Sequence, residues 1–165
     1  MGKDTVDVIA ATWARELPGV VGNELELGKR AARLSTMLAA RVDAELARLG
    51  LTKAEYEILA VLRTVGAPFR LRPTDIAARL LLTSGGTSNI LRRLEAAGLV
   101  ERDADPSDAR SSWVRLSERG VAVAEDAVRA ASAAQAALLG AVPVDVVEAA
   151  VDALRRVLVE LGDTS

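Results

Sequence analysis

The periodicity of the apolar residues changes in one place along this chain, and that change constrains the fold more than any other sequence feature. Up to residue 97, apolar side chains recur every three or four residues, as in amphipathic helices. Residues 99–102 and 112–116 instead alternate between apolar and polar side chains, and a polar segment rich in turn-forming residues separates them. The helical pattern then returns. The sequence therefore predicts a mainly helical chain with one β-hairpin.

Capping and stop signals set the expected helix boundaries. Thr52 begins a capping box, in which its side chain and a glutamate three residues later satisfy each other's free amides. Either Thr83 or Ser84 is expected to cap the helix that precedes the hairpin, and Gly98 to end it. Seven helices are expected, over residues 5–16, 24–49, 52–65, 73–81, 84–97, 117–139 and 144–161.

The composition excludes several kinds of chemistry. The chain has no cysteine and no histidine, which removes disulfides, thiol redox chemistry, and the residues most often used for zinc binding and for acid–base catalysis near neutral pH. No phosphate-binding loop of the G-x-x-x-x-G-K type is present. We therefore expect no enzymatic activity, no catalytic residues, no cofactor and no metal site.

No apolar stretch reaches the roughly 20 residues that a membrane-spanning helix needs. The N-terminal residues also lack the basic and apolar pattern of a signal peptide. We expect a cytoplasmic protein that does not contact a membrane.

Charge is distributed unevenly along the chain. The net charge is −2, yet residues 63–120 carry 10 arginines against 7 acidic residues. A basic centre between acidic ends is typical of a nucleic-acid-binding segment held by terminal helices, although small asymmetries of this kind are common.

The order helix, helix, turn, helix, hairpin over residues 51–117 predicts a winged helix-turn-helix domain, whose second helix enters the major groove of DNA. The helix expected at 84–97 begins with small and polar side chains, which let its N-terminus approach phosphates and base edges. Its expected DNA-binding residues are Ser84, Gly85, Thr87, Ser88, Asn89, Arg92 and Arg93.

Three motifs resemble the MarR family of bacterial transcription regulators: LEAAGLVER (94–102), DPSDAR (105–110) and VRLS (114–117). The resemblance implies a ligand-responsive regulator, usually a repressor, that binds a pseudo-palindromic duplex DNA site as a symmetric homodimer. It also implies that residues 1–50 and 118–165 form a helical dimerisation region. The fold class expected is mainly α, a winged helix-turn-helix with long N- and C-terminal dimerisation helices.

The same resemblance assigns a role to the hairpin tip. Arg110 would enter the minor groove, with Asp108 holding its guanidinium and Ser111 next to it. The alternative is that Asp108 and Arg110 form only an exposed ion pair, worth under about 1 kcal/mol.

An N-terminal extension carrying Trp13 resembles the urate-responsive subgroup of that family. Glu57 stands where that subgroup has an aspartate, and Ile90 stands where it has an arginine. Without the arginine an anionic ligand would lose its cationic partner, so a small aromatic or phenolic effector is the expectation, with Trp13, Glu57 and Ile90 at its site. The alternative is that Trp13 only anchors the first helix.

The last helix has apolar residues at alternating steps of three and four, a pattern typical of helices that pack on another helix. This favours self-association. A function of another class remains open, because winged helices can also serve as protein-interaction modules. Binding to duplex DNA that weakens steeply with salt would distinguish the regulator from such a module.

Overall fold

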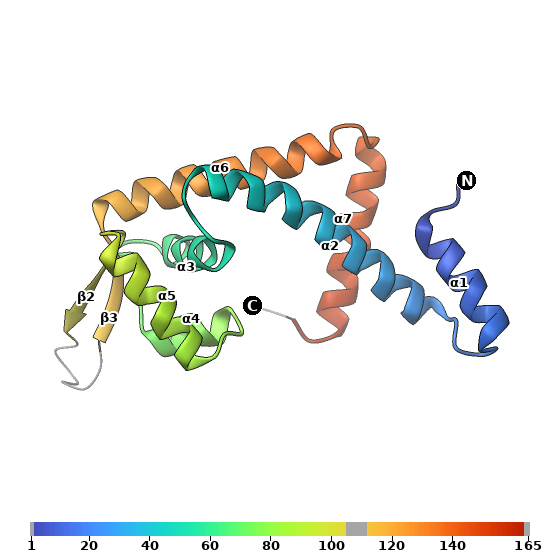
Figure 1. Cartoon of the computed structure of the whole chain (residues 1–165), viewed down its shortest axis with the longest axis horizontal. Helices are drawn as coiled ribbons and strands as arrows, with labels where there is room; N and C mark the ends of the chain where they lie inside the picture. The colour runs from blue at the N-terminus through green and yellow to red at the C-terminus, as the bar shows by residue number, and fades with distance from the viewer. Residues whose placement is uncertain (1, 105–111, 164–165) are drawn as a thin grey trace. The chain divides into compact units, whose positions relative to one another are not determined.

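A computed structural model describes residues 2–104 and 112–163 of the chain (Figure 1). It divides into two compact units, Met1–Arg41 and Val42–Ser165, and each is described by itself. The elements are α1 (Thr5–Glu16), α2 (Asn23–Arg48), α3 (Lys53–Thr64), β1 (Arg70–Leu71), α4 (Pro73–Arg79), α5 (Ser84–Ala96), β2 (Val100–Ala104), β3 (Ser112–Leu116), α6 (Glu118–Leu139) and α7 (Val144–Glu160).

In the first unit, polar contacts join α1 to the beginning of α2. The Asp4 carboxylate caps α1 by accepting the backbone N–H groups of Val6 at 2.7 Å and Asp7 at 3.0 Å. The Arg30 guanidinium of α2 donates to Asp4 at 2.9 Å and to Asp7 at 2.8 Å. The backbone N–H of Asp7, followed by Arg30, lowers the pKa of Asp4. The predicted helix at 5–16 is confirmed.

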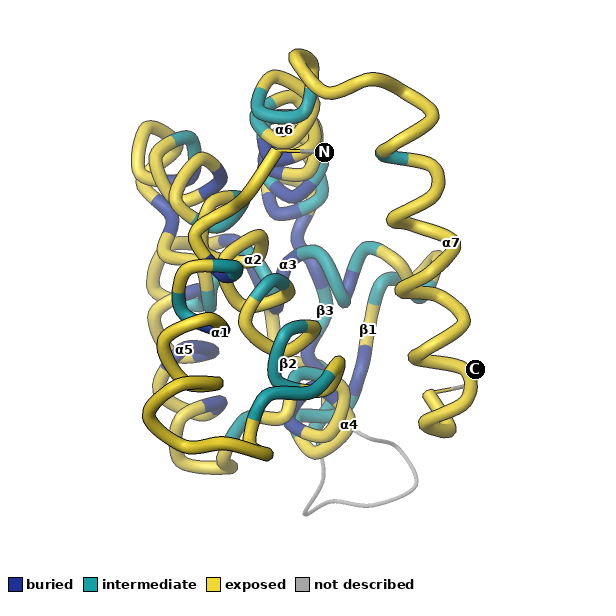
Figure 2. The backbone as a smooth tube through the Cα atoms, turned by 90° about the vertical axis from the view of Figure 1, so that its right-hand side faces the viewer, coloured by how far each residue is buried: buried dark blue, intermediate teal, exposed yellow. Residues whose placement is uncertain are grey.

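The second unit contains the main hydrophobic core, between α3, α5, the sheet and α6. Figure 2 shows buried segments in these elements, and α4 and the C-terminal end of α2 also contribute to the core. Leucine, isoleucine and valine supply most of the buried area, because the chain has few aromatic residues. The core comprises Val42, Leu46, Leu51, Ile58, Leu59, Leu62, Leu71, Ile76, Ile90, Leu91, Leu94, Leu99, Val100, Val114, Leu116, Ala124, Ala127 and Ala131.

The sheet has three antiparallel strands in the order β1-β3-β2. Strands β2 and β3 form the predicted hairpin, with Val100 opposite Leu116 and Ala104 opposite Ser112. Strand β1 was not predicted. It is only two residues long, too short for its alternation of polar and apolar side chains to form a recognisable pattern.

The predicted helix at 73–81 is too long, since α4 ends at Arg79. Leu81 has a φ of 53°, a left-handed conformation that usually requires glycine after a helix. The backbone N–H of Leu82 closes this turn by donating to the carbonyl of Ala77 at 2.9 Å. Because leucine occupies the position, the sequence carries no stop signal there.

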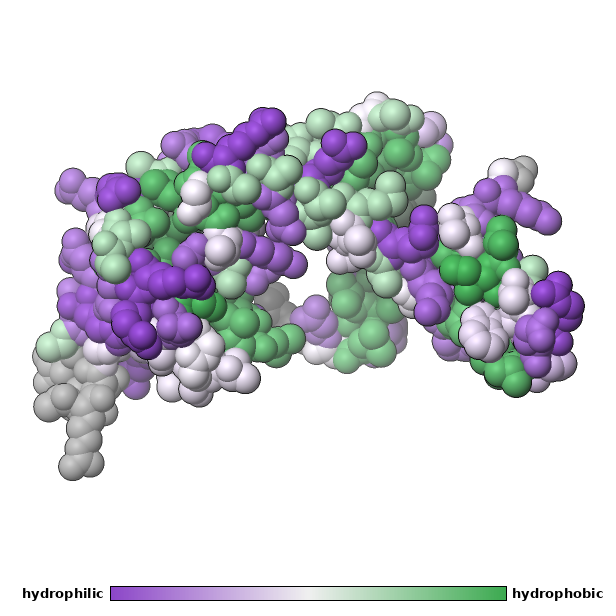
Figure 3. Space-filling view, in the orientation of Figure 1, coloured by the Kyte–Doolittle hydropathy of each residue, from purple (hydrophilic) through white to green (hydrophobic). Residues whose placement is uncertain are grey.

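Helix α7 has no buried residue, although its sequence predicts a packing seam. Figure 3 shows apolar side chains on the surface of this helix. The helix and its C-cap expose Val144, Val146, Val151, Leu154, Val157, Leu158, Val159 and Leu161.

The apolar stripe predicted for α2 is likewise mostly exposed, and only Val42 and Leu46 of that helix are buried. The expected fold class, a mainly helical winged helix-turn-helix, is confirmed by the element order and the antiparallel sheet. The division into a DNA-binding domain at 51–117 and a dimerisation region stays a prediction.

Candidate nucleic-acid interface

Helix α5 has one buried face and one exposed polar face. Thr83 caps it, since its hydroxyl accepts the backbone N–H of Gly86 at 3.2 Å. Ile90, Leu91 and Leu94 point into the core. The exposed residues recur at steps of three and four, as one face of a helix requires. They are Ser84, Gly85, Gly86, Ser88, Asn89, Arg92, Arg93 and Ala96.

Thr87 requires a correction to the expected set. Its side chain is 1% exposed, and its hydroxyl donates to the carbonyl of Thr83 at 3.0 Å. A buried hydroxyl that already bonds within its own helix cannot reach a base edge. Thr87 therefore belongs to the core side of α5, while its neighbour Ser88 is exposed.

The two arginines of α5 differ in their surroundings. The Nε of Arg93 lies 3.5 Å from a carboxylate oxygen of Glu55, whose side chain is only 13% exposed. Arg93 thus connects α5 to the beginning of α3. Arg92 is exposed and forms no ion pair within residues 2–104 and 112–163. The structure therefore offers Arg92 as the more available cation on this helix.

The base of the hairpin is held by two arginines on opposite faces of the sheet. Arg102 pairs with Glu95 of α5 and donates to the Ser112 hydroxyl at 3.2 Å. Arg115 donates to Asp103 at 3.0 Å and also pairs with Glu101. The hydrogen bond to Asp103, supported by the charges of both acids, raises the pKa of Arg115 above its usual value. The predicted tip residues, Asp108, Arg110 and Ser111, lie outside the described residues.

Trp113 of β3 contacts two further arginines. The guanidinium carbon of Arg70 is 4.9 Å from the ring centroid, and that of Arg72 is 5.0 Å away. Both distances fit cation–π stacking. Sequence reasoning left Trp113 unassigned and did not identify Arg70 or Arg72. The strand β1 that presents Arg70 was too short to be recognised from its pattern.

The hairpin joins α6 through a close backbone approach. The Ser117 backbone N–H donates to the carbonyl of Leu99 at 3.1 Å, and the Ser117 hydroxyl donates to the carbonyl of Gly98 at 2.8 Å. A β-carbon placed on Gly120 would lie 1.9 Å from the Leu99 oxygen. Only glycine therefore allows α6 to approach the strand so closely.

The three residues predicted to bind an effector are found in different settings. Trp13 is on α1 in the first unit and is 42% exposed. Glu57 is on α3 in the second unit, 3.8 Å from the Lys53 ammonium. Ile90 is 8% exposed and belongs to the hydrophobic core. Its contact with an effector therefore stays a prediction.

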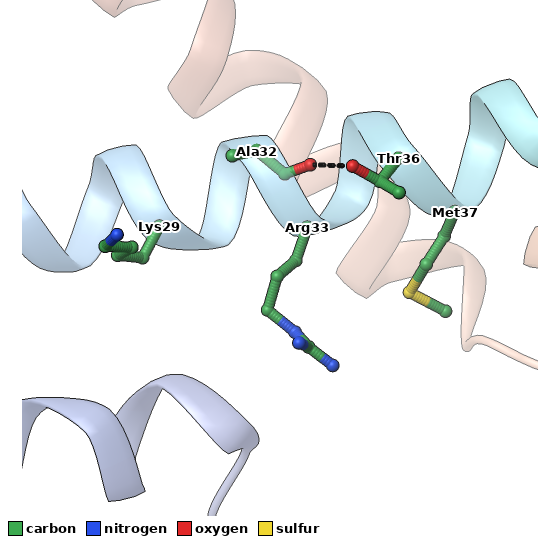
Figure 4. A pocket seen from close by; sticks show the side chains of 5 residues that line it. All are labelled: Lys29, Ala32, Arg33, Thr36 and Met37. Atoms are coloured by element: carbon green, nitrogen blue, oxygen red, sulfur yellow. Dashed lines mark hydrogen bonds between the residues drawn. The ribbon is translucent and has the colours of Figure 1, made fainter.

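Two shallow hollows on the surface differ in how well they could hold an effector. The first measures about 330 Å³ and lies along α2; its lining residues are Lys29, Ala32, Arg33, Thr36 and Met37. Figure 4 shows that the whole lining comes from that one helix, with the Thr36 hydroxyl bonded to the Ala32 carbonyl. Ligand pockets usually bury most of the ligand's surface, which one helix cannot do.

The second hollow, of about 390 Å³, lies between α3 and α6. Its charged groups pair with one another, because Glu125 accepts from Arg63 at 2.9 Å and from Arg129 at 3.0 Å. These two hydrogen bonds, with that of Arg63 the larger, lower the pKa of Glu125. Both arginines of the lining therefore already pair with an acid, which leaves neither of them as an unpaired cation for an anionic ligand.

Within the part of the chain that the structure describes, no helix is long and apolar enough to cross a membrane.

Comparison with known proteins gives one consistent picture. The MarR family model matches residues 49–111. The transcriptional repressor Rv2887 of Mycobacterium tuberculosis is 33% identical over 119 residues, covering 72% of this chain and 84% of the repressor. The solved structure of CouR from Rhodococcus jostii RHA1, bound to p-coumaroyl-CoA, is 28% identical with a TM-score of 0.66 and covers 79% of this chain and 90% of CouR.

A mutant of MarR from E. coli in complex with operator DNA has a TM-score of 0.70 at 22% identity. The match covers 88% of this chain and 97% of that one. At this identity the likeness concerns the fold alone.

Proposed function

Since this chain belongs to the MarR family of helix-turn-helix transcriptional regulators, we propose that it represses transcription by binding a pseudo-palindromic duplex site as a homodimer. In this proposal residues 51–117 read the DNA, and residues 1–50 and 118–165 form the dimer. The relative Rv2887 is named a transcriptional repressor, which supports repression over activation. The protein would act in the cytoplasm, without catalysis.

One observation carries the DNA-binding part of the proposal: the polar face that α5 leaves exposed. Ser84, Ser88 and Asn89 offer short hydrogen-bonding side chains at the N-terminal half of the helix, and Arg92 follows one turn later. Side chains at the start of a recognition helix are those that meet base edges in the major groove, and asparagine pairs well with adenine. The exposed Gly85 leaves room for the DNA backbone to approach.

The dimer is supported by the apolar surface of α7. A helix usually buries an apolar stripe against a neighbour, yet α7 exposes large residues such as Leu154 and Leu158. A second copy of the chain would cover them. Two-fold symmetry would then place two α5 helices about one duplex turn apart, which is why the site is expected to be a pseudo-palindrome.

The test begins with selection of bound duplexes from a random pool by the purified full-length protein. The expected product is a pseudo-palindrome with half-sites about 10 base pairs apart. Failure to enrich any sequence, or sedimentation as a monomer at micromolar concentration, would contradict the proposal.

Two α5 variants then compare neighbouring residues of equal charge. Arg92→Ala is expected to lower affinity for the selected site by at least tenfold, because Arg92 is the available cation. Arg93→Ala should have a smaller effect, since Arg93 already pairs with Glu55. Equal effects in a band-shift titration would contradict this assignment of α5.

The wing is tested separately. Arg110→Ala removes the arginine expected in the minor groove, and a strong loss of operator affinity is predicted. Unchanged affinity would remove the hairpin tip from the DNA-binding surface and leave α5 as the reader.

We propose, further, that a small aromatic or phenolic effector controls this binding. The p-coumaroyl group of the CoA thioester bound to CouR is phenolic, which supports a phenolic effector, although that ligand as a whole is large and anionic. Trp13, Glu57 and Ile90 remain the residues proposed to contact it. Titration of neutral phenols against the protein–operator complex should release the DNA, and Trp13→Ala should weaken that release without weakening DNA binding. A panel that releases nothing would contradict the effector proposal alone.

A further inference from the structure

We propose that Trp113 holds Arg70 as a phosphate-contacting cation at the base of the wing, with Arg72 stacked on the same ring, so that the sheet adds its own contact to the DNA backbone. This inference rests on the proposed DNA-binding function and adds a surface to it. It assigns a role to a stacked cluster, defined as Arg70, Trp113 and Arg72, that lies outside the polar face of α5.

Strand register places this cluster on the outer face of the sheet. Val114 and Leu116 of β3 are buried, so the alternate residues Trp113 and Arg115 face the other way. Arg70 of β1 is paired with Arg115 in the ladder, and it therefore shares the outer face. Arg72 is two residues further along and is the N-cap residue of α4.

The position of the cluster matches the expected path of a DNA strand. In helix-turn-helix proteins the helix before the recognition helix crosses the phosphate backbone, and a wing contacts the duplex beside it. Here β1 leads directly into α4 and pairs with the wing strand β3. Arg70 and Arg72 are thus located between the two elements that flank the backbone.

The charges on this face leave Arg70 available. Arg115 is balanced by two acids, Asp103 and Glu101. Arg70 is exposed and has no ion pair within residues 2–104 and 112–163. Its guanidinium therefore stacks on Trp113 without an acid to neutralise it.

Stacking prepares an arginine for phosphate without using its donors. A guanidinium lying on an aromatic face keeps its N–H groups in its own plane, directed outward, where a phosphate can accept two of them. The ring also restricts the rotamers of a long side chain, which reduces the entropy lost on binding. The cluster is therefore suited to a phosphate, while α5 is suited to bases.

The experiment measures affinity against salt concentration for the selected operator and for a scrambled duplex, using the full-length protein. Loss of one phosphate contact reduces the slope of log K against log salt by about 0.9, which corresponds to about an eightfold loss of affinity at 0.1 M salt. Arg70→Ala is expected to show this change equally on both duplexes. Arg129→Ala, which removes the same charge from the exposed surface of α6, is the matched control and should leave the slope unchanged.

Variants of Trp113 separate stacking from charge. Trp113→Leu keeps both arginines but removes the ring, and it should reduce the slope as Arg70→Ala does; Trp113→Phe keeps a ring face and should retain most of the slope. Thermal unfolding of each variant checks that the fold is intact, and the Phe variant provides the comparison if the Leu variant is unstable.

If Arg70→Ala leaves the slope of log K against log salt unchanged, the inference is overturned. A loss of affinity for the operator but not for the scrambled duplex would also overturn it, because it would indicate that Arg70 contacts bases. In both cases wild-type protein still binds the operator. If the wild type binds neither duplex, the proposed function itself fails.

Discussion

Gly120→Ala is expected to destabilise the junction between the hairpin and α6. The added β-carbon would lie 1.9 Å from the Leu99 carbonyl oxygen and 2.9 Å from its carbon. Both are backbone atoms, so relief requires α6 and β2 to separate. That movement also lengthens the hydrogen bond from the Ser117 N–H to the Leu99 carbonyl, now 3.1 Å.

The magnitude follows from three contributions. Forced overpacking typically costs about 1–3 kcal/mol, and a weakened hydrogen bond costs a further 0.5–1.5 kcal/mol or so. Against these, alanine is favoured over glycine in a helix by up to about 1 kcal/mol. The free energy of unfolding should therefore fall by about 2 kcal/mol, and Tm should fall by about 4–8 °C for a chain of this size.

The assay is urea and thermal unfolding followed by circular dichroism, at one fixed protein concentration because the proposed dimerisation would add to apparent stability. Gly28→Ala is the matched control. Gly28 lies inside α2 with nothing within 4 Å of an added β-carbon, so this variant should gain about 0.5–1 kcal/mol. A Gly120→Ala protein as stable as the wild type would refute the argument from the close approach.

Three other predictions concern the core, pH and assembly. Thr87→Val should change operator affinity less than twofold in a band shift, while Ser88→Ala should lower it severalfold, because only Ser88 is exposed. A larger loss for Thr87→Val would support the original prediction that Thr87 contacts DNA. The lowered pKa of Glu125 means that its ion pairs stabilise the fold above the usual glutamate pKa of 4.5 and cease to do so as pH falls through the lower folded value. In the Glu125→Gln variant, the free energy of unfolding should therefore depend less on pH below 4.5 than in the wild type. The same pH dependence in both proteins would contradict this. Leu154→Glu should yield monomers in sedimentation, and an intact dimer would exclude that face of α7 from the interface.

Local signals in the sequence predicted most of the helices and the hairpin. The capping box at Thr52 fixed the beginning of α3, and its reciprocal hydrogen bonds are present in the structure. Gly98, with a φ of 66°, ended α5 near the predicted residue. These features depend on neighbouring residues alone, so a single sequence contains them.

The features that the sequence did not predict depend on contacts between distant residues. Strand β1 exists because β3 pairs with it, and the stack on Trp113 needs both strands. Thr87 was expected to be exposed because threonine is polar, but its place on α5 turns it inward and its hydroxyl bonds within the helix. Residue type alone does not show that Thr87 is buried and Ser88 exposed, because both are small and polar; their positions on the two faces of α5 do.

The ion pair between Arg102 and Glu95 has a consequence for regulation. It fastens the wing strand β2 to α5, and the bond from the Ser117 hydroxyl to the Gly98 carbonyl secures the same corner. Within one subunit, α5 and the base of the hairpin are therefore expected to move together as one rigid unit. In the proposed dimer, an effector that releases DNA would therefore have to change the distance between the two copies of this unit, because each copy is held together internally.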